Sequence, residues 1–438
     1  MSDVNRTAVR RLLAIALGAT VLLLIALAVM VGRQLSVEAL PPLTAQPAPA
    51  DPTLVQRGAY LARAGNCAAC HTARGGEPYA GGRGVETPFG TVFAGNLTPD
   101  ATGLGGWSAD AFWRAMQHGQ SRDGRLLYPA FPYESFSRIT RDDSDALHAF
   151  LRSLPPVAQA NQLHALRFPY NTQAALAVWR ELYFEPTAFQ PDASQSAEWN
   201  RGAYLVQGLG HCAACHSPRD ALGGVDSARA LDGGLMPGRG WYAPSLRAAH
   251  EAGPSATPGA STIELLKTGV TAGASAMGPM AEVVFNSTQH LNDADLGAIG
   301  QYLTAQALPV ALPPAAPAAP SAQLELGEKV YKQHCLDCHS EQGQGAAREG
   351  LTGSGRGMAY PPLAGNRAVQ LVSPVNAVQA VLGGGFAPAT AGHPQPYGMP
   401  PFRTLLNDTE IAAVTSFIRQ RWGHQASAVT PLDVQGIR

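Results

Sequence analysis

Three short stretches of the sequence determine how the rest of the chain is interpreted. The chain reads CAACH at residues 67–71, CAACH again at residues 212–216 and CLDCH at residues 335–339. These stretches contain all six cysteines, so no thiol is left for a structural disulfide elsewhere. Each has two thiols three positions apart and an imidazole directly after the second, which predicts the same chemistry at three places in the chain.

A Cys-x-x-Cys-His stretch is the attachment sequence of a c-type haem. The two thiols reach the vinyl groups of one porphyrin, and the adjacent imidazole is the proximal ligand of the iron. We therefore expect three covalently bound haems. The expected thioether residues are Cys67, Cys70, Cys212, Cys215, Cys335 and Cys338, and the expected proximal ligands are His71, His216 and His339.

Two other uses of paired cysteines fit the sequence less well. A structural zinc site needs further cysteines or histidines near each pair, and none stands at a recurring position. A thiol-disulfide oxidoreductase carries its pair on a β-α-β framework, and the sequence has no such pattern. A backbone carbonyl normally holds the second nitrogen of a metal-bound imidazole, and Pro244, Pro361 and Pro362 are placed to provide one.

The sequence around the three stretches is repeated. RGAYL at 57–61 precedes the first and RGAYL at 201–205 precedes the second, while the third copy keeps only Gly327 and Tyr331. Later in each repeat, an acidic residue stands seven positions before an aromatic one, with apolar residues between them at helical spacing, which predicts an amphipathic closing helix. These pairs are Asp143 with Phe150, Asp295 with Tyr302, and Glu410 with Phe417.

We predict an all-α fold class, with three tandem cytochrome c-type domains after an N-terminal transmembrane helix. Strand-like alternation is weak, and 47 glycines and 35 prolines indicate loop-rich domains built around a bulky cofactor. The expected boundaries are 1–34 for the anchor, 35–51 for a Pro/Ala-rich tether, 52–157 for the first domain, 158–195 for a linker, 196–310 for the second domain, 311–322 for a Pro/Ala-rich linker, 323–424 for the third domain and 425–438 for a C-terminal tail.

The N-terminus is typical of an export and anchoring segment. Arg6, Arg10 and Arg11 precede an uncharged apolar run over 12–32, long enough as a helix to span a bilayer. The basic residues place the N-terminus in the cytoplasm and the rest of the chain outside. We therefore expect a single-pass protein of the bacterial inner membrane with periplasmic haem domains. A cleaved signal peptide, with Ala26 and Ala28 as its small residues, is the alternative.

An electron-transfer haem needs its sixth iron position closed, and a methionine thioether does this while raising the reduction potential. Met280 and Met399 are the candidates in the second and third domains, because flanking glycine and proline favour a tight loop over a packed helix. Met277 competes with Met280, and Met236 and Met358 lie in earlier glycine-rich loops.

The first domain differs from the other two. Phe131 stands where a loop methionine is expected, and phenylalanine cannot coordinate iron. Met116 is the candidate ligand there, His118 is the alternative, and an open iron position would fit a multihaem peroxidase or oxidase instead of an electron carrier. The formal net charge of −1, with acidic and basic residues interspersed, excludes nucleic acid as a partner.

Further motifs make the chain similar to a known family over about residues 55–423. They are NLTPD at 96–100 with GGW at 105–107, LYPA at 127–130, WYAP at 241–244, GPMAEVV at 278–284 and YPPLAGN at 360–366. Together with the three haem motifs and the RGAYL stretches, they resemble the triheme cytochrome c subunit of bacterial membrane-bound dehydrogenases. That family serves quinoprotein alcohol dehydrogenases, flavin-dependent gluconate and sorbitol dehydrogenases, and molybdenum-containing aldehyde oxidoreductases.

The resemblance implies electron transfer without catalysis in this chain. A partner dehydrogenase subunit would supply electrons, three haems would carry them, and membrane ubiquinone or a terminal oxidase would accept them. Met280 and Met399 match the axial methionines of the family. Phe131 replaces the methionine of its Tyr-Pro-Ala-Met-Pro-Tyr motif, and with Met116 and the anchor it makes the chain look more like the cytochromes that accompany the molybdenum aldehyde oxidoreductases.

Overall fold

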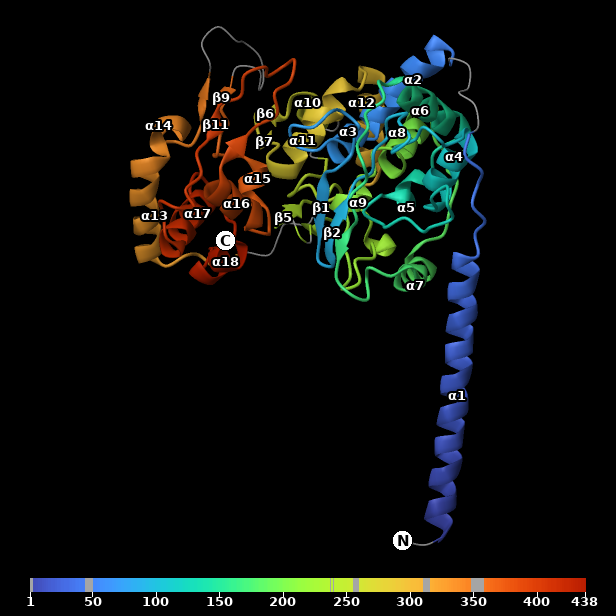
Figure 1. Cartoon of the computed structure of the whole chain (residues 1–438). Coiled ribbons are helices and arrows are strands. Elements are labelled where there is room, and N and C mark those ends of the chain that lie inside the picture. Colours follow the sequence, from blue (N-terminus) through green and yellow to red (C-terminus); the bar gives the residue numbers. More distant parts are fainter. Residues whose placement is uncertain are drawn as a thin grey trace.

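The computed structural model describes residues 3–43, 50–236, 238, 240–254, 260–309, 316–347 and 358–438. Part of the expected tether, at 44–49, and part of the expected linker, at 311–315, therefore lie outside the described residues. One long helix, α1 (Asp3–Leu35), projects from a body that contains all other elements (Figure 1). In the part of the chain that is described, α1 is the one helix apolar and long enough to cross a membrane.

The body is built on one helix pair that occurs three times. Helix α2 (Pro52–Ala64) packs on α6 (Arg141–Ser153), α8 (Ala197–Gln207) packs on α12 (Asp293–Ala305), and α13 (Ser321–His334) packs on α17 (Asp408–Gln420). We name residues 52–157, 196–310 and 323–424, which contain these pairs, the first, second and third units. Figure 1 shows the first two units side by side and the third at the opposite end of the body from α1.

Each opening helix carries a glycine where it crosses its closing helix. A Cβ added at this glycine would lie 1.9 to 2.2 Å from a carbonyl oxygen of the closing helix. The helices approach so closely because this position has no side chain. The three contacts join Gly58 to Ala146, Gly202 to Ala298 and Gly327 to Ala413.

The closing helices begin as their sequences predict. The N-cap residues Thr140, Asn292 and Asn407 each accept a hydrogen bond from the backbone N–H three residues later. That third residue is the acidic one of the repeat, whose negative charge favours the N-terminal end of the helix dipole. The prediction of three closing helices with an acidic first turn is confirmed, but α17 is buried on all sides from residue 411 to 419 and is therefore not amphipathic.

Short helices and hairpins fill the long loops between the paired helices. The helices are α3 (Cys67–His71), α4 (Ala109–His118), α5 (Tyr133–Phe136), α7 (Gln173–Tyr183), α9 (Ala213–His216), η1 (Ser227–Arg229), α10 (Ala260–Thr268), α11 (Gly278–Asn286), η2 (Thr288–His290), α14 (Leu336–His339), α15 (Arg367–Gln370), α16 (Val375–Gly383) and α18 (Pro431–Ile437). Of these, α7 lies in the expected linker at 158–195 and α18 in the expected tail, where it packs on α16 and α17.

The strands are two to four residues long and all pair antiparallel. In the described residues, β1 (Gly84–Thr87), β2 (Gly90–Phe93) and β3 (Ala165–Leu166) form one sheet. The two-stranded pairs are β4 (Gly234–Met236) with β5 (Trp241–Ala243), β6 (Val270–Thr271) with β7 (Ala274–Ser275), β8 (Ala346–Ala347) with β9 (Met358–Tyr360), and β10 (Gly385–Phe386) with β11 (Gly398–Met399). The protein is thus mostly helical, as predicted, with small hairpins that the sequence pattern does not reveal.

Candidate haem sites

The three Cys-x-x-Cys-His stretches lie at the short helices α3, α9 and α14. Each of these helices follows shortly after an opening helix, in the second unit after an intervening turn. Their first thiols lie against the hydrophobic core of their own unit, where Cys67, Cys212 and Cys335 contact the buried clusters. Burial, and secondly the neighbouring thiol, raises the pKa of each of these three thiols to about 12. A thiol that stays protonated is a poor nucleophile, so these sites do not suit thiol-disulfide exchange.

The motif histidines are oriented by backbone carbonyls. The Nδ1 atom of His71 lies 2.7 Å from the carbonyl oxygen of Gly95, that of His216 lies 2.7 Å from Pro244, and that of His339 lies 3.2 Å from Pro361. A carbonyl oxygen only accepts hydrogen bonds, so Nδ1 carries the proton and donates it. The lone pair of Nε2 is then available for a metal, which is the usual arrangement around a ligating imidazole.

Burial also lowers the pKa of all three imidazoles, against the opposing effect of the carbonyl hydrogen bond. They are therefore neutral near pH 7, and neutral imidazole is the form that binds a metal. The expected carbonyls of Pro244 and Pro361 are found, whereas that of Gly95 was missed. A signal exists in the sequence, because each of these three residues stands two positions before a leucine, at Leu97, Leu246 and Leu363.

Two of the three candidate methionines lie in the same hydrophobic cluster as their cysteine. Met116, on α4, is 4 % exposed and belongs to the cluster of the first unit on which Cys67 and Phe131 pack. Met399, in β11, packs on the cluster of the third unit together with Cys335. The alternative ligand His118 is exposed at the end of α4, which supports Met116 over His118.

Met280 lies in the first turn of helix α11 and not in the tight loop that its flanking glycine and proline predicted. This helix contacts α3 of the first unit as well as η2 and α10 of its own. The turn before it is fixed by Gly278, whose φ of 54° favours glycine and whose added Cβ would lie 2.6 Å from the indole of Trp241. The competing Met277 extends toward the third unit, where its Cε lies 3.9 Å from the Cβ position of Gly385. Met277 therefore faces the third unit, and Met280 remains our candidate ligand for the second unit.

The first and second units exchange tyrosines across their interface. Asp143 of the first unit pairs with Arg57 of the same unit at 2.5 Å and accepts a hydrogen bond at 2.5 Å from the hydroxyl of Tyr204 in the second unit. Tyr204 comes from the RGAYL stretch that leads to Cys212. The carboxylate in the first turn of one closing helix thus holds the opening helix of the other unit.

The reciprocal contact has the same form. Asp295 of the second unit pairs with Arg201 at 2.8 Å and accepts a hydrogen bond at 2.6 Å from the hydroxyl of Tyr60 in the first unit. Burial alone would raise the pKa of Asp295, but the hydrogen bonds from Arg201 and Tyr60 outweigh it and the pKa is lowered. Because one acid and one tyrosine come from each unit, the two units form a pseudo-symmetric pair.

The donor set at each site fits a covalently bound porphyrin better than it fits zinc. Within the described residues, no group of three or more histidine, cysteine, aspartate or glutamate side chains is arranged to hold a metal ion. Each site instead offers two half-buried cysteines and one neutral imidazole with its Nε2 available. Two thioethers and one axial nitrogen are the protein ligands of a c-type haem.

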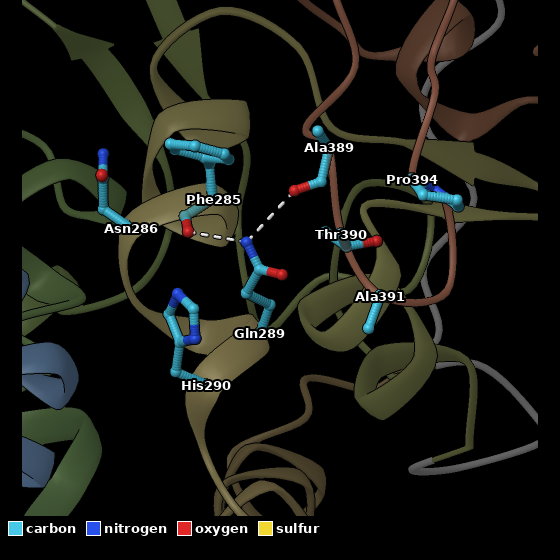
Figure 2. Close-up of a pocket in the computed structure, with 8 residues that line it drawn as sticks. All are labelled: Phe285, Asn286, Gln289, His290, Ala389, Thr390, Ala391 and Pro394. Atoms are coloured by element: carbon cyan, nitrogen blue, oxygen red, sulfur yellow. Dashed lines mark hydrogen bonds between the residues drawn. The ribbon is translucent and has the colours of Figure 1, made fainter.

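An open groove of about 420 Å³ lies at the seam of the second and third units (Figure 2). Gln289 spans it, because its side-chain amide donates to the carbonyl of Phe285 at 2.7 Å and to that of Ala389 at 3.2 Å. His290, on the same wall, contacts Arg63 of the first unit at 3.1 Å. The groove has no thiol or carboxylate in its lining, so we regard it as a joint between units and not as a redox site.

Comparison with known proteins finds cytochromes c and cytochrome c subunits of dehydrogenases. The cytochrome c family model matches residues 55–155 and 324–422. The chain is 38 % identical over 422 residues to the alcohol dehydrogenase (quinone), cytochrome c subunit, of Gluconacetobacter polyoxogenes, covering 90 % of this chain and 86 % of that one. It is 37 % identical over 407 residues to the gluconate 2-dehydrogenase cytochrome c subunit of Pantoea cypripedii, covering 89 % and 90 %.

A third relative is larger than this chain. A nicotinate dehydrogenase subunit of Pseudomonas putida is 42 % identical over 381 residues, which are 84 % of this chain and 30 % of that protein. The fold and the three motif helices define a c-type cytochrome. The chain belongs to the family of cytochrome c subunits of dehydrogenases, and it is an electron-transfer subunit, not a catalytic one.

Proposed function

We propose that the chain binds three c-type haems, one in each unit. The main support is that every motif histidine donates its Nδ1 proton to a backbone carbonyl. All three units are also built on the same helix pair, in which a glycine allows the two helices to cross closely. The six motif cysteines would form the thioether bonds. His71, His216 and His339 would be the proximal ligands and Met116, Met280 and Met399 the distal ones, and the bound haems would each carry one electron.

The partner in this proposal is the catalytic subunit of a dehydrogenase of the molybdenum, quinoprotein or flavin type. The support is that relatives covered over most of their length are cytochrome c subunits of alcohol and gluconate dehydrogenases. Electrons would enter from this catalytic subunit and leave to ubiquinone or a terminal oxidase. The contribution of the polypeptide is to fix the spacing of the haems and to tune their potentials.

The proposed location is the bacterial inner membrane, with α1 as a single-pass anchor and the three units on the periplasmic side. The side chains of α1 from Arg10 to Val29 are exposed in the isolated chain, although most are apolar, which suits a lipid environment. The basic residues in front of the apolar run favour a cytoplasmic N-terminus, so the three units would lie on the periplasmic side.

Counting haems in three paired variants tests the proposal. We expect three haems per mature wild-type chain by intact mass and by absorbance of the denatured, reduced protein. Cys67→Ala with Cys70→Ala, Cys212→Ala with Cys215→Ala, and Cys335→Ala with Cys338→Ala should each retain two. A wild-type chain with two haems, or a pair whose loss leaves the count unchanged, would remove that site from the proposal.

The dehydrogenase partner is tested separately with solubilised membranes of the source organism. The subunit that co-purifies with this chain should carry a molybdenum, quinone or flavin cofactor. Its substrate should reduce the haems of the complex and not those of the isolated chain. Reduction of the isolated chain by the same substrate would contradict the division of labour.

A further inference from the structure

The segment that joins the first two units exposes several apolar side chains, and its helix α7 packs on α1. Among the described residues outside α1, the two most exposed large apolar side chains are Leu163, at 93 %, and Phe168, at 81 %. Both precede α7, and Leu182 near the end of α7 is 62 % exposed. Apolar side chains that gather in one exposed patch mark an interaction surface, whereas single exposed ones do not, so the surroundings of these residues matter.

Helix α7 has two apolar faces. Leu176, Ala177 and the buried Arg180 face the first unit, as expected for a helix packed on a domain. Ala174, Val178 and Leu182 recur every four residues on the other side, so this face is also apolar although no other described element covers Ala174 and Leu182. A surface helix without a further partner normally presents polar residues there.

The position of α7 along α1 suggests what covers this face. Val31, at the end of the apolar run, packs on the small cluster formed by Leu126, Leu176 and Ala177. One turn later, the side-chain amide of Gln34 donates to Glu181 at 2.9 Å, and Arg33 lies 3.6 Å from the same carboxylate. Helix α7 is therefore fixed where the apolar run of α1 ends, and Figure 1 shows it beside the last turns of α1.

The end of the apolar run is also where a spanning helix leaves the hydrocarbon and enters the headgroup layer. Aromatic residues favour this layer, and the region carries Phe168, Tyr170 and Trp179. We infer that Leu163, Phe168 and the outer face of α7 form a second membrane contact, which inserts into the interfacial layer of the bilayer that holds α1. This inference rests on the proposed anchoring role of α1.

Two physical features make such a contact effective. Because α1 holds the segment at the surface, insertion is intramolecular and needs no high intrinsic affinity. The charges of this segment and of the end of α1 are mixed, since Arg33 pairs with Glu181 and the segment also carries Arg167 and Glu185. Apolar insertion and not attraction to anionic lipid must therefore provide the binding. The contact should therefore form on neutral phosphatidylcholine and be insensitive to salt.

Site-specific photo-crosslinking of the full-length chain tests the inference. A photoreactive phenylalanine analogue replaces Phe168, Leu182, Val21 or Phe386 in separate proteins, each reconstituted into phosphatidylcholine vesicles. Val21 lies within α1 and reports the anchor, whereas Phe386 is 68 % exposed in the third unit and serves as the matched control. We expect lipid adducts by mass spectrometry at positions 168, 182 and 21, in low and high salt, and none at 386.

Each other outcome decides against the inference in a recognisable way. Adducts at position 21 without adducts at 168 and 182 would overturn the second contact and leave the anchor standing. The absence of adducts at position 21 would overturn both. In native membranes, adducts from 168 and 182 to a polypeptide would assign the surface to a protein partner and not to lipid.

Discussion

Among single residues, Met116 is the one whose role decides the character of the first unit. It is buried in the cluster that Cys67 and Phe131 join, while His118 is exposed at the helix end. If Met116 is the sixth ligand of the first haem iron, Met116→Leu should convert one haem of three from low spin to high spin, because leucine offers no donor atom. Electron paramagnetic resonance of the oxidised protein measures this change.

The control for Met116 is His118→Gln, which should leave all three haems low-spin. Met280→Leu should produce a high-spin signal of equal size from the second unit. A wild-type spectrum that already contains one high-spin haem, unchanged in Met116→Leu, would contradict ligation by Met116. It would revive the interpretation that the first haem binds an external ligand such as peroxide.

His148 is a buried histidine outside the motifs, and we expect it to make the first unit sensitive to acid. Burial lowers the pKa of His148 to about 4, although the carbonyl of Trp107 at 3.2 Å opposes the shift. The unfolded chain, with an ordinary value of about 6.5, binds the proton first as the pH falls. Stability is therefore fully present above about pH 6.5 and is lost progressively toward pH 4, by roughly 3 kcal/mol.

Denaturant unfolding of wild type and His148→Gln, followed by haem absorbance, checks this prediction. The difference in unfolding free energy between the two proteins should shrink between pH 7 and pH 4, because glutamine does not titrate. Between pH 7 and pH 8 the difference should stay constant, which provides an internal control. Parallel curves over the whole range would show that His148 does not cause the acid sensitivity.

Much of the candidate site follows from sequence because its chemistry is local. The cysteine pair and the histidine of each site are adjacent, so one short helix places them. The carbonyl of Gly95 and the tyrosine exchange with Asp143 and Asp295 did not follow, because these contacts join residues 24 to 235 positions apart. No periodicity in a single sequence reports such pairings.

Among the helices, the crossing of each opening and closing helix is the feature most exposed to mutation. Gly58→Ala would place a Cβ 1.9 Å from the carbonyl oxygen of Ala146, so the helices must separate. Overpacking of this kind costs about 1 to 3 kcal/mol. We expect Gly58→Ala to lower the denaturation midpoint of the first unit and leave that of the third unchanged.

Gly297→Ala is the matched control for the glycine prediction. Gly297 lies in α12, and its added Cβ would lie 3.4 Å from the side chain of Glu198, with no backbone in the way. Alanine in a helix is favoured over glycine by about 0.5 to 1 kcal/mol, so this variant should be neutral or more stable. Equal destabilisation by Gly58→Ala and Gly297→Ala would contradict the crossing argument.

The closing helices were predictable because an acidic residue, an aromatic residue seven positions later and apolar residues between them lie in one short stretch of sequence. The hairpins were not, since strands of two to four residues carry no measurable alternation. Helix α18 has only seven residues and packs on α16 and α17, and α7 packs on α1. Short elements of this kind form because of tertiary contacts, which propensity does not contain.

For the molecule taken as a whole, the exchanged tyrosines determine how firmly the first two units are joined. Tyr60→Phe and Tyr204→Phe each remove one charge-assisted hydrogen bond across the interface, worth about 1.5 to 3 kcal/mol. Each variant should increase hydrogen exchange in the helices of both units. Tyr331→Phe is the matched control, since that hydroxyl donates to Ser340 within the third unit and should affect the third unit alone. An effect of Tyr60→Phe confined to the first unit would contradict the coupling.

The same interface should loosen in acid through Asp295. Arg201 and Tyr60 together lower its pKa despite burial, whereas an unfolded aspartate has a value of about 4. A group with a lowered folded pKa stabilises the protein above the unfolded value, and this stabilisation is lost as the pH falls through the folded value. Asp295→Asn should therefore weaken the first two units at pH 6 and remove part of their acid sensitivity below pH 4. Unfolding midpoints at pH 6, 5, 4 and 3 test this, and identical pH dependence in the two proteins would show that Asp295 does not couple the units to acid.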